Sequence, residues 1–469
     1  MMSPPSGSKR PRSAPRPNRR GRKLGRVHSW GGEKRLPRSA VVGALVAAVL
    51  AMVVHDHLVP FDVRFFGLTQ NGYDLDTYRA AVRGLWDGKR LYEAPALNQA
   101  WFVYPPFATL VLAPLAWASF EVAKWMLLVL SLSALALIAW RILRLAGVRA
   151  DSRLGLASAA LAAIVVDVEP VQATLWWGQI NILLMAVVLL DLLGPAQSRW
   201  RGVGLGLAAG IKLTPLVFLP YLLCTRQWRA ATLALGTMAA TVALTWPLLP
   251  RDSEWFWSHL GDTAHISRID HLANQTINGF LARYFFPQPR PEWLWIALSL
   301  LVLAAGLAVA VWAHRRGEHA LALVLVGLTG CAVSPFSWAA HWVWFAPAIV
   351  WLVAKACTTQ GPWSRGWIYR AAGLLALVFM WTLHRPGRGH TTIYFSGVYW
   401  NFLDLRPFWA GQLVSGWYPL VFLCFTIATA SWLRLSTGGC AEPDELATLT
   451  ADIEDYPPEI FDEELAVRA

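Results

Sequence analysis

The stretch SAVVGALVAAVLAMVVHDHL spans residues Ser39–Leu58 and contains no charged side chain before Asp56. A helix needs about 20 predominantly apolar residues to cross the hydrocarbon core of a bilayer. Further apolar runs follow at intervals along the chain, for example Glu121–Trp140 and Trp293–Ala313. The sequence therefore predicts an all-α polytopic membrane protein.

The overall composition favours the same class. Hydrophobic residues make up 56% of the 469 residues, charged residues only 15%, and the mean hydropathy is +0.41. A soluble protein carries about 25% charged residues. The 27 tryptophans are explained mostly by the preference of Trp for membrane interfaces.

The two ends of the chain have opposite charge. Residues 9–38 hold twelve Lys or Arg and one acidic residue, Glu33, whereas residues 442–464 hold ten Asp or Glu and no Lys or Arg. Such polar, charged segments are typical of disordered arms. We interpret residues 1–38 as a cytoplasmic arm that contacts anionic membrane lipid rather than nucleic acid, and residues 434–469 as an acidic cytoplasmic tail.

The positive-inside rule orients the segments between these arms. Ser39–Leu58 crosses outward, and residues 59–106 form the first outside loop; residues 250–292 and 384–409 form the second and third. Loops carrying Arg144, Arg201 and Arg315 mark the inside. Residues 39–433 thus contain about twelve spanning or re-entrant helices, with both termini inside.

Two apolar segments depart from a simple span. Phe107–Trp117 is too short to cross and either dips into the membrane or extends the next helix. Gly202–Leu223 is predicted to form two short helices with Lys212 at the outer turn, because Pro215 breaks a helix and a lysine at mid-membrane is costly.

The five cysteines show no CxxC spacing and lie mostly in or beside apolar runs. This pattern predicts neither a disulfide framework nor a metal site, and no cofactor motif is present. We expect the protein to use no cofactor.

Polar side chains gather at the predicted outer ends of the spans. Ionisable groups at membrane depth are costly and tend to be kept for function, so this face is the predicted site. Its members are Asp74, Asp76, Asp167, Glu169, Gln179, Asn181, Lys212, Asn274, Asn278 and His341.

The stretch YDLDTY, Tyr73–Tyr78, brings two carboxylates to this face. A helical pattern over Thr77–Asp87 predicts Asp76 as the helix N-cap, which leaves Asp74 as the candidate general base. The alternative is that both are solvated loop charges.

Three further features have a structural and a functional interpretation. Trp176-Trp177-Gly178-Gln179-Ile180-Asn181 either packs helices or binds a sugar. Lys212 either extends its ammonium to the interface or holds a lipid phosphate in a broken helix that lines a cavity. His341, in the turn after Trp338, is either structural or part of the chemistry.

These motifs, in their order and spacing, resemble glycosyltransferase family 87, the GT-C-type membrane enzymes of mycobacteria and their relatives. The resemblance covers roughly residues 40–433. It lies in Asp74-Leu75-Asp76-Thr77-Tyr78, Gly88, Leu91-Tyr92, Tyr104-Pro105-Pro106-Phe107, Gly178-Gln179-Ile180-Asn181, Lys212-Leu213-Thr214-Pro215, Ser334-Pro335-Phe336-Ser337-Trp338 and His341-Trp342.

The resemblance implies a polyprenyl-phosphate sugar donor, a reaction with inversion, and a glycolipid or lipoglycan acceptor. The family's catalytic aspartate falls on Asp74, and Asp76 occupies a variable position. Many members carry two adjacent histidines after the Ser-Pro-x-Ser-Trp segment. Here Ala340 replaces the first, which puts in doubt any role that needs both rings.

The leading hypothesis is an α-(1→2)-mannosyltransferase of the plasma membrane that uses polyprenyl-phosphate mannose on the extracytoplasmic side. The alternatives are an arabinofuranosyltransferase using decaprenyl-phosphate arabinose, a lipid-linked sugar transporter or flippase, and a catalytically silent scaffold. The predicted catalytic residues are Asp74 and His341. Lys212 and Arg268 are predicted to bind the donor phosphate. The predicted substrate-binding residues are Asp76, Tyr78, Tyr104, Trp176, Trp177, Gln179, Asn181, Asn278 and Trp338.

Overall fold

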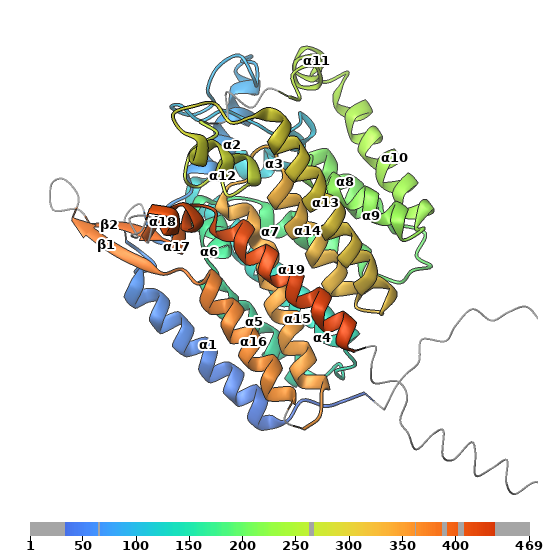
Figure 1. Ribbon diagram of the computed structural model, residues 1–469. Coiled ribbons are helices and arrows are strands. Elements are labelled where there is room, and N and C mark those ends of the chain that lie inside the picture. Colours follow the sequence, from blue (N-terminus) through green and yellow to red (C-terminus); the bar gives the residue numbers. More distant parts are fainter. Residues whose placement is uncertain are drawn as a thin grey trace, which may run out of the picture.

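Helices make up nearly all of the fold (Figure 1). The computed structural model describes residues 33–63, 66–261, 267–361, 363–386, 392–401 and 408–436. Most of the basic arm and nearly all of the acidic tail lie outside these residues. The predicted all-α class is confirmed.

Five helices in the described residues are long and apolar enough to cross a membrane. They are α1 (Arg38–Leu58), α4 (Phe120–Leu145), α13 (Glu292–Arg315), the continuous pair η3 (Ala339–Trp344) and α15 (Phe345–Thr358), and α19 (Trp417–Leu435). A sixth span arises if α6 (Glu169–Trp177) and α7 (Asn181–Leu192) count as one. The chain bends by 118° between these two helices.

The remaining helices are shorter or less apolar. They are α2 (Tyr73–Trp86), α3 (Phe107–Trp117), α5 (Ser152–Ile164), η1 (Val165–Asp167), α8 (Val203–Ile211), η2 (Thr214–Val217), α9 (Phe218–Cys224), α10 (Trp228–Thr245), α11 (Pro250–Ser258), α12 (Ile277–Phe285), α14 (His319–Val333), α16 (Trp363–Val378), α17 (Val398–Asn401) and α18 (Phe408–Ser415). The predicted count of about twelve spans is not confirmed, because several apolar runs form short or broken helices.

The break predicted within Gly202–Leu223 is confirmed. Helix α8 ends at Ile211, Lys212 adopts an extended conformation, and η2 begins at Thr214 with Pro215 in its first turn. Proline is tolerated there because its missing N–H would have no partner in the helix anyway. Lys212 is thereby held at a gap between two helices rather than on a helix face.

Helix α14 forms the centre of the packed helices. Nearly all its residues are buried, as expected for a helix that is apolar on every side. Gly327 allows the indole of Trp344 to approach closely, because a Cβ atom at Gly327 would lie 2.1 Å from that ring. This packing supports the 3₁₀ segment η3, which carries His341.

Segments predicted to lie inside contact one another at one end of the molecule. Lys34 donates to the carbonyl of Thr358 at 2.7 Å, and Arg35 pairs with Asp151 at 2.9 Å. Helix α1 starts at this end and runs for 21 residues, about 30 Å. It ends next to Val59, which lines the cavity described below.

A short antiparallel hairpin projects from the helices near the end of α1 (Figure 1). Its strands are β1 (Thr382–Pro386) and β2 (Thr392–Ser396), with Thr382 opposite Ser396. His384 Nε2 lies 2.7 Å from the carbonyl oxygen of Leu58. The sequence analysis predicted only an outside loop here, and Tyr394 and Ser396 of the hairpin border the same cavity.

Candidate active site

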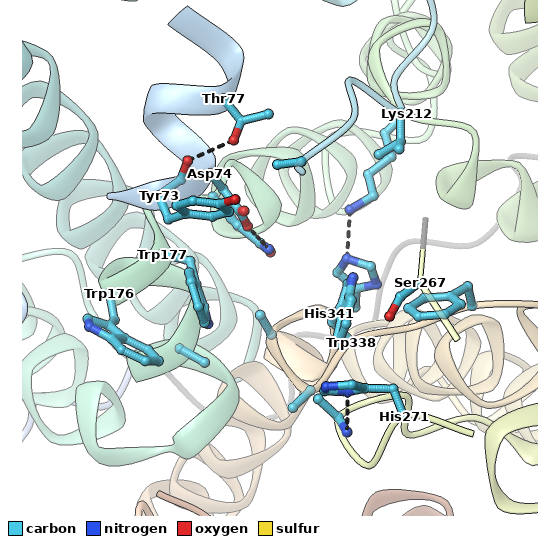
Figure 2. Close-up of a pocket in the computed structure, with 18 of the residues that line it drawn as sticks. Tyr73, Asp74, Thr77, Trp176, Trp177, Lys212, Ser267, His271, Trp338 and His341 are labelled. Carbon is cyan, nitrogen blue, oxygen red and sulfur yellow. Dashed lines mark hydrogen bonds between the residues drawn. The ribbon is translucent and has the colours of Figure 1, made fainter. Parts of the chain in front are cut away.

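A cavity of about 780 Å³ lies at the end of the molecule opposite the Lys34 contacts, and Asp74, Lys212 and His341 all line it. Figure 2 shows Lys212 extending toward the ring of His341, with Asp74 entering from α2. The three residues are far apart in sequence but share this one space. The convergence of a carboxylate, an amine and an imidazole predicted from sequence is therefore present.

Asp74 lies in the first turn of α2. The helix starts about one turn earlier than the predicted start at Thr77. It starts at Tyr73 with Gly72 as its N-cap residue, and the Asn71 side-chain oxygen accepts hydrogen bonds from the backbone N–H groups of Gly72 and Tyr73 just before it. The prediction that Asp76 caps the helix is wrong. A carboxylate in the first turn is stabilised by the helix dipole.

Asp76 is not among the residues that line the cavity. Its side chain is 44% exposed and pairs with Arg79 at 2.8 Å. Arg79 in turn donates to the carbonyls of Leu115 and Ala118. Asp76 therefore helps to anchor α2 against the end of α3, and the structure does not bring it to the site.

Burial raises the pKa of Asp74 to about 6, although the hydrogen bond from Gln179 and the positive charge of Lys212 both act to lower it. Above that pH the carboxylate is ionised. A general base works best when its pKa lies near the operating pH. Asp74 is thus a stronger proton acceptor than an exposed aspartate and is still mostly ionised at neutral pH.

A chain of side-chain hydrogen bonds connects Asp74 to Lys212. Gln179 Nε2 donates to Asp74 Oδ2, and Asn181 Nδ2 donates to Gln179 Oε1. Lys212 Nζ donates to Asn181 Oδ1 at 2.9 Å. We call these four residues the amide chain. In these three hydrogen bonds each donor faces the next acceptor: Lys212 donates to Asn181, Asn181 to Gln179, and Gln179 to the carboxylate.

The bend between α6 and α7 positions the two amides. Gly178 ends α6 with φ of 72°, a left-handed conformation that suits glycine. A Cβ atom there would also lie 2.8 Å from the Cβ of Leu75. Gly178 therefore lets the bend come close to α2, so that Gln179 reaches Asp74.

Lys212 contacts three different groups around its ammonium. Besides Asn181, Nζ lies 3.0 Å from His341 Nε2 and 5.2 Å from the centroid of the Tyr104 ring. The Tyr104 hydroxyl is 2.8 Å from that of Tyr78, and both tyrosines line the cavity. The ammonium is held at the cavity wall, where an anionic ligand can reach it.

The turn before η3 positions His341. Ser337 Oγ lies 3.3 Å from His341 Nδ1, so both ring nitrogens have polar neighbours. Asn278 is buried outside the cavity and donates to the carbonyl of Pro335 at 2.8 Å. Asn278 therefore supports the turn, while Trp338 in the same turn lines the cavity.

Position 340 contributes its backbone to the site. The carbonyl of Ala340 accepts hydrogen bonds from Thr174 Oγ1 at 2.8 Å and from Asn181 Nδ2 at 3.0 Å. Ala340 itself lines the cavity. The site therefore has one imidazole at this turn, that of His341.

Aromatic rings cover the wall between α2 and α6. The rings of Trp176 and Trp177 lie 4.5 Å apart, and that of Tyr73 lies 6.1 Å from Trp177. Buried Lys124 of α4 donates to the carbonyls of Leu175 and Trp176. This lysine satisfies the free carbonyls at the end of α6 and fixes the position of the tryptophans.

Arg268 was predicted to bind the donor phosphate, but the structure does not bring it to the cavity. Its side chain is 73% exposed and pairs with Asp270 at 2.6 Å. Its neighbour Ser267 lines the cavity instead. The cation that the structure does place at the cavity wall is Lys212.

Several lining residues were not predicted as substrate contacts. Glu169 was noted on the outer face but given no role, although a buried carboxylate next to a tryptophan-rich motif is a signal that could have singled it out. His271 and Tyr399 come from loops and short helices that have no periodic pattern. The unpredicted polar and aromatic lining residues include Phe66, Glu169, Gln172, His271, Tyr394, Tyr399 and Trp400.

The chain is similar in sequence to mycobacterial mannosyltransferases. The family model for glycosyltransferase family 87 matches residues 102–335. The polyprenol-phosphate-mannose-dependent α-(1-2)-phosphatidylinositol mannoside mannosyltransferase of Mycobacterium tuberculosis is 38% identical over 61% of this chain and 71% of its own. The enzyme of the same name from Mycolicibacterium smegmatis is 33% identical over 81% of this chain and 89% of its own length.

A relative with a different sugar is also similar. The α-(1->3)-arabinofuranosyltransferase of Corynebacterium glutamicum is 34% identical over 59% of this chain and 65% of its own. No solved structure matches the chain. The similarity to the mannosyltransferases thus extends over more of the chain than the similarity to this arabinofuranosyltransferase.

Proposed function

The chain belongs to glycosyltransferase family 87, and on that basis we propose that it transfers mannose from polyprenyl-phosphate mannose in α-(1→2) linkage. The mannosyltransferases named above carry this activity in their names. The observation that carries the proposal is the cavity shared by Asp74, Lys212 and His341. The acceptor is proposed to be a membrane glycolipid or lipoglycan, since the relatives named above act on phosphatidylinositol mannosides.

The proposed reaction is a direct displacement at the anomeric carbon. Asp74 takes the proton of an acceptor hydroxyl, whose oxygen attacks that carbon as the bond to the phosphate oxygen breaks. The electron pair of the broken bond stays on the polyprenyl phosphate. Because the configuration inverts, an α product requires a β-linked donor. The raised pKa of Asp74, about 6, suits a base that must hold the proton after transfer.

Lys212 is proposed to bind the donor phosphate, with His341 beside it. Negative charge grows on the phosphate as its bond to the sugar breaks. A fixed ammonium in a water-poor site stabilises that charge more strongly than water does. The contact between Lys212 Nζ and His341 Nε2 keeps the ammonium pointed into the cavity.

The cavity is proposed to open on the extracytoplasmic side of the plasma membrane. The predicted inside loops, rich in Arg and Lys, meet at the end near Lys34 and Arg35, and the cavity lies at the other end of α1. By the positive-inside rule the basic end faces the cytoplasm. The donor lipid and the membrane acceptor would then reach Asp74 from the outer leaflet.

A pair of matched cysteine variants tests this orientation. Lys89 in the first outside loop and Arg149 in a basic loop are both exposed cations. In a background in which the exposed Cys224 and Cys424 are serine, a membrane-impermeant maleimide added to intact cells should label Lys89→Cys and spare Arg149→Cys. Detergent should make both reactive. If only Arg149→Cys were labelled in intact cells, the basic loop would face the outside and the proposed orientation would be wrong.

A donor comparison with the purified full-length protein tests the reaction. With a phosphatidylinositol mannoside acceptor, radiolabelled polyprenyl-phosphate mannose should give a product that an α-(1→2)-specific mannosidase releases. Decaprenyl-phosphate arabinofuranose should give at most about 1% of that rate, since a site built for one sugar rejects an analogue lacking hydrogen-bonding groups. Faster arabinose transfer would favour the arabinofuranosyltransferase instead.

A further inference from the structure

The face of α6 that borders the cavity carries a second set of side chains, separate from the amide chain. Glu169, Gln172, Ala173 and Trp176 all line the cavity. Their spacing of three, four and seven residues puts them on one face of a helix. We call this face the α6 stripe. From Glu169 to Trp176 it extends about 10 Å along the helix axis, and its Trp176 end leads into the bend at Gly178.

Glu169 is a buried carboxylate with unused acceptor capacity. Its two oxygens accept hydrogen bonds from the hydroxyls of Tyr399, at 3.0 Å, and Tyr418. Within the described residues it forms no ion pair with Lys, Arg or His. A carboxyl group has more hydrogen-bonding positions than the two that the tyrosines occupy, so Glu169 can bond a further group. Glu169 lines the cavity, where a ligand hydroxyl can reach it.

Gln172, one turn further along α6, has an amide that faces the cavity. Its side chain is 3% exposed and forms no side-chain hydrogen bond with the residues that the structure describes. Its donor and acceptor atoms are therefore free to bond a ligand. Because Gln172 also lines the cavity, a ligand that supplies both a donor and an acceptor would satisfy it.

We infer that the α6 stripe binds the sugar residues of the acceptor that precede the one receiving the new mannose. This inference rests on the proposed function. Sugar hydroxyls both donate and accept, which matches a carboxyl group beside an amide, and the indole of Trp176, stacked on Phe66, adds apolar surface to the cavity wall. The side chain of Ala173 leaves room between these groups.

The other parts of the substrates fit the α6 stripe poorly. The donor phosphate finds its cation at Lys212, which lines the cavity, whereas the carboxyl oxygens of Glu169 offer an anion no positive charge. The polyprenyl chain would cover a carboxylate with hydrocarbon, which is costly. The cavity therefore has two poles: an ammonium pole for the phosphate, and a carboxylate pole for an uncharged, hydroxyl-rich ligand.

The test compares two synthetic acceptors, octyl α-mannoside and octyl α-mannotrioside, on the purified full-length protein. Wild type should have the lower KM for the trioside. In Glu169→Gln and in Gln172→Ala, the ratio of trioside KM to monoside KM should rise about tenfold, the loss expected for one hydrogen bond to a charged or buried group. The KM for the mannosyl donor should change less than about twofold.

Glu121→Gln is the matched control, because Glu121 is exposed at the start of α4 and is not a lining residue. It should keep the wild-type KM ratio. A rise in the donor KM, an equal rise for both acceptors, or an unchanged ratio in both stripe variants would overturn the inference.

Direct binding separates this inference from the proposed reaction. Calorimetric titration of the trioside into the purified protein should show a dissociation constant about tenfold higher for Glu169→Gln than for wild type. If wild type binds the trioside but transfers no mannose, the proposed function fails and the α6 stripe stands. If Glu169→Gln binds the trioside as tightly as wild type, the inferred sugar site on the α6 stripe is wrong, whether or not the protein transfers mannose.

Discussion

Asp74→Asn is expected to lower mannosyl transfer by about 10²–10⁴-fold, the range found when a general base is removed. The amide has nearly the same shape and can still accept a hydrogen bond from Gln179, so the protein should fold normally. It cannot take the acceptor proton at any accessible pH. The measurement is the rate of transfer from labelled polyprenyl-phosphate mannose by equal amounts of purified protein.

Asp76→Asn supplies the matched control for this variant. It makes the same change two residues away, at a carboxylate that pairs with Arg79 outside the cavity, and should keep activity within about threefold of wild type. If Asp74→Asn retained activity within a few-fold, or if Asp76→Asn lost as much, the base would lie elsewhere.

The pH profile of wild type provides a second readout of the same residue. Burial raises the pKa of Asp74 to about 6, and the reaction needs the ionised form. The value of kcat/KM should therefore be flat above that pH and fall about tenfold per pH unit below it. An acid limb near pH 4, the ordinary range of an exposed aspartate, would show that another group controls it.

Lys212→Met is expected to lower kcat by about 10²–10³-fold, as seen when one stabilising donor is removed from a developing anion. The thioether side chain fills similar space but carries no charge. Transfer from polyprenyl-phosphate mannose should show a fall in kcat together with a rise in donor KM, because the same ammonium holds the phosphate before and after the bond breaks. Lys212→Arg should recover part of the loss.

Lys89→Met is the control for lost charge, since Lys89 is exposed in the first outside loop and lines no part of the cavity. Its activity should match wild type. A Lys212→Met enzyme with unchanged donor KM and kcat would place the phosphate away from the gap between α8 and η2.

Much of the fold could be predicted from local sequence, and the exceptions have physical causes. Proline and a costly lysine indicated the break at Lys212, and apolar length indicated α1, α4 and α13. The spacing of apolar residues could not reveal the 118° bend between α6 and α7, because that bend depends on Gly178 packing against Leu75. The β1–β2 hairpin was missed because its pairing is made between strands within a segment that reads as a polar loop.

The candidate site was predictable where a motif gathers several polar residues, and not where a contact is purely tertiary. Asp74, Gln179, Asn181, Lys212 and His341 were chosen from sequence and share one hydrogen-bonded network. Arg268 was chosen for its charge alone, and its partner Asp270 holds it at the surface. Asp76 was predicted at the N-cap because the start of α2 was placed one helical turn too late; Gly72 occupies that position.

The amide chain has a consequence for how the enzyme handles two lipids at once. Asp74 and Lys212, the proposed proton acceptor and the proposed phosphate-binding amine, are tied to each other through Gln179 and Asn181, which belong to one bend and are buried. Their separation is thus a fixed length built into the protein rather than something each substrate adjusts. In the proposed mechanism, the acceptor hydroxyl must lie at Asp74 while the donor phosphate lies at Lys212. The bend therefore selects substrate pairs whose reacting atoms match the distance between these two side chains.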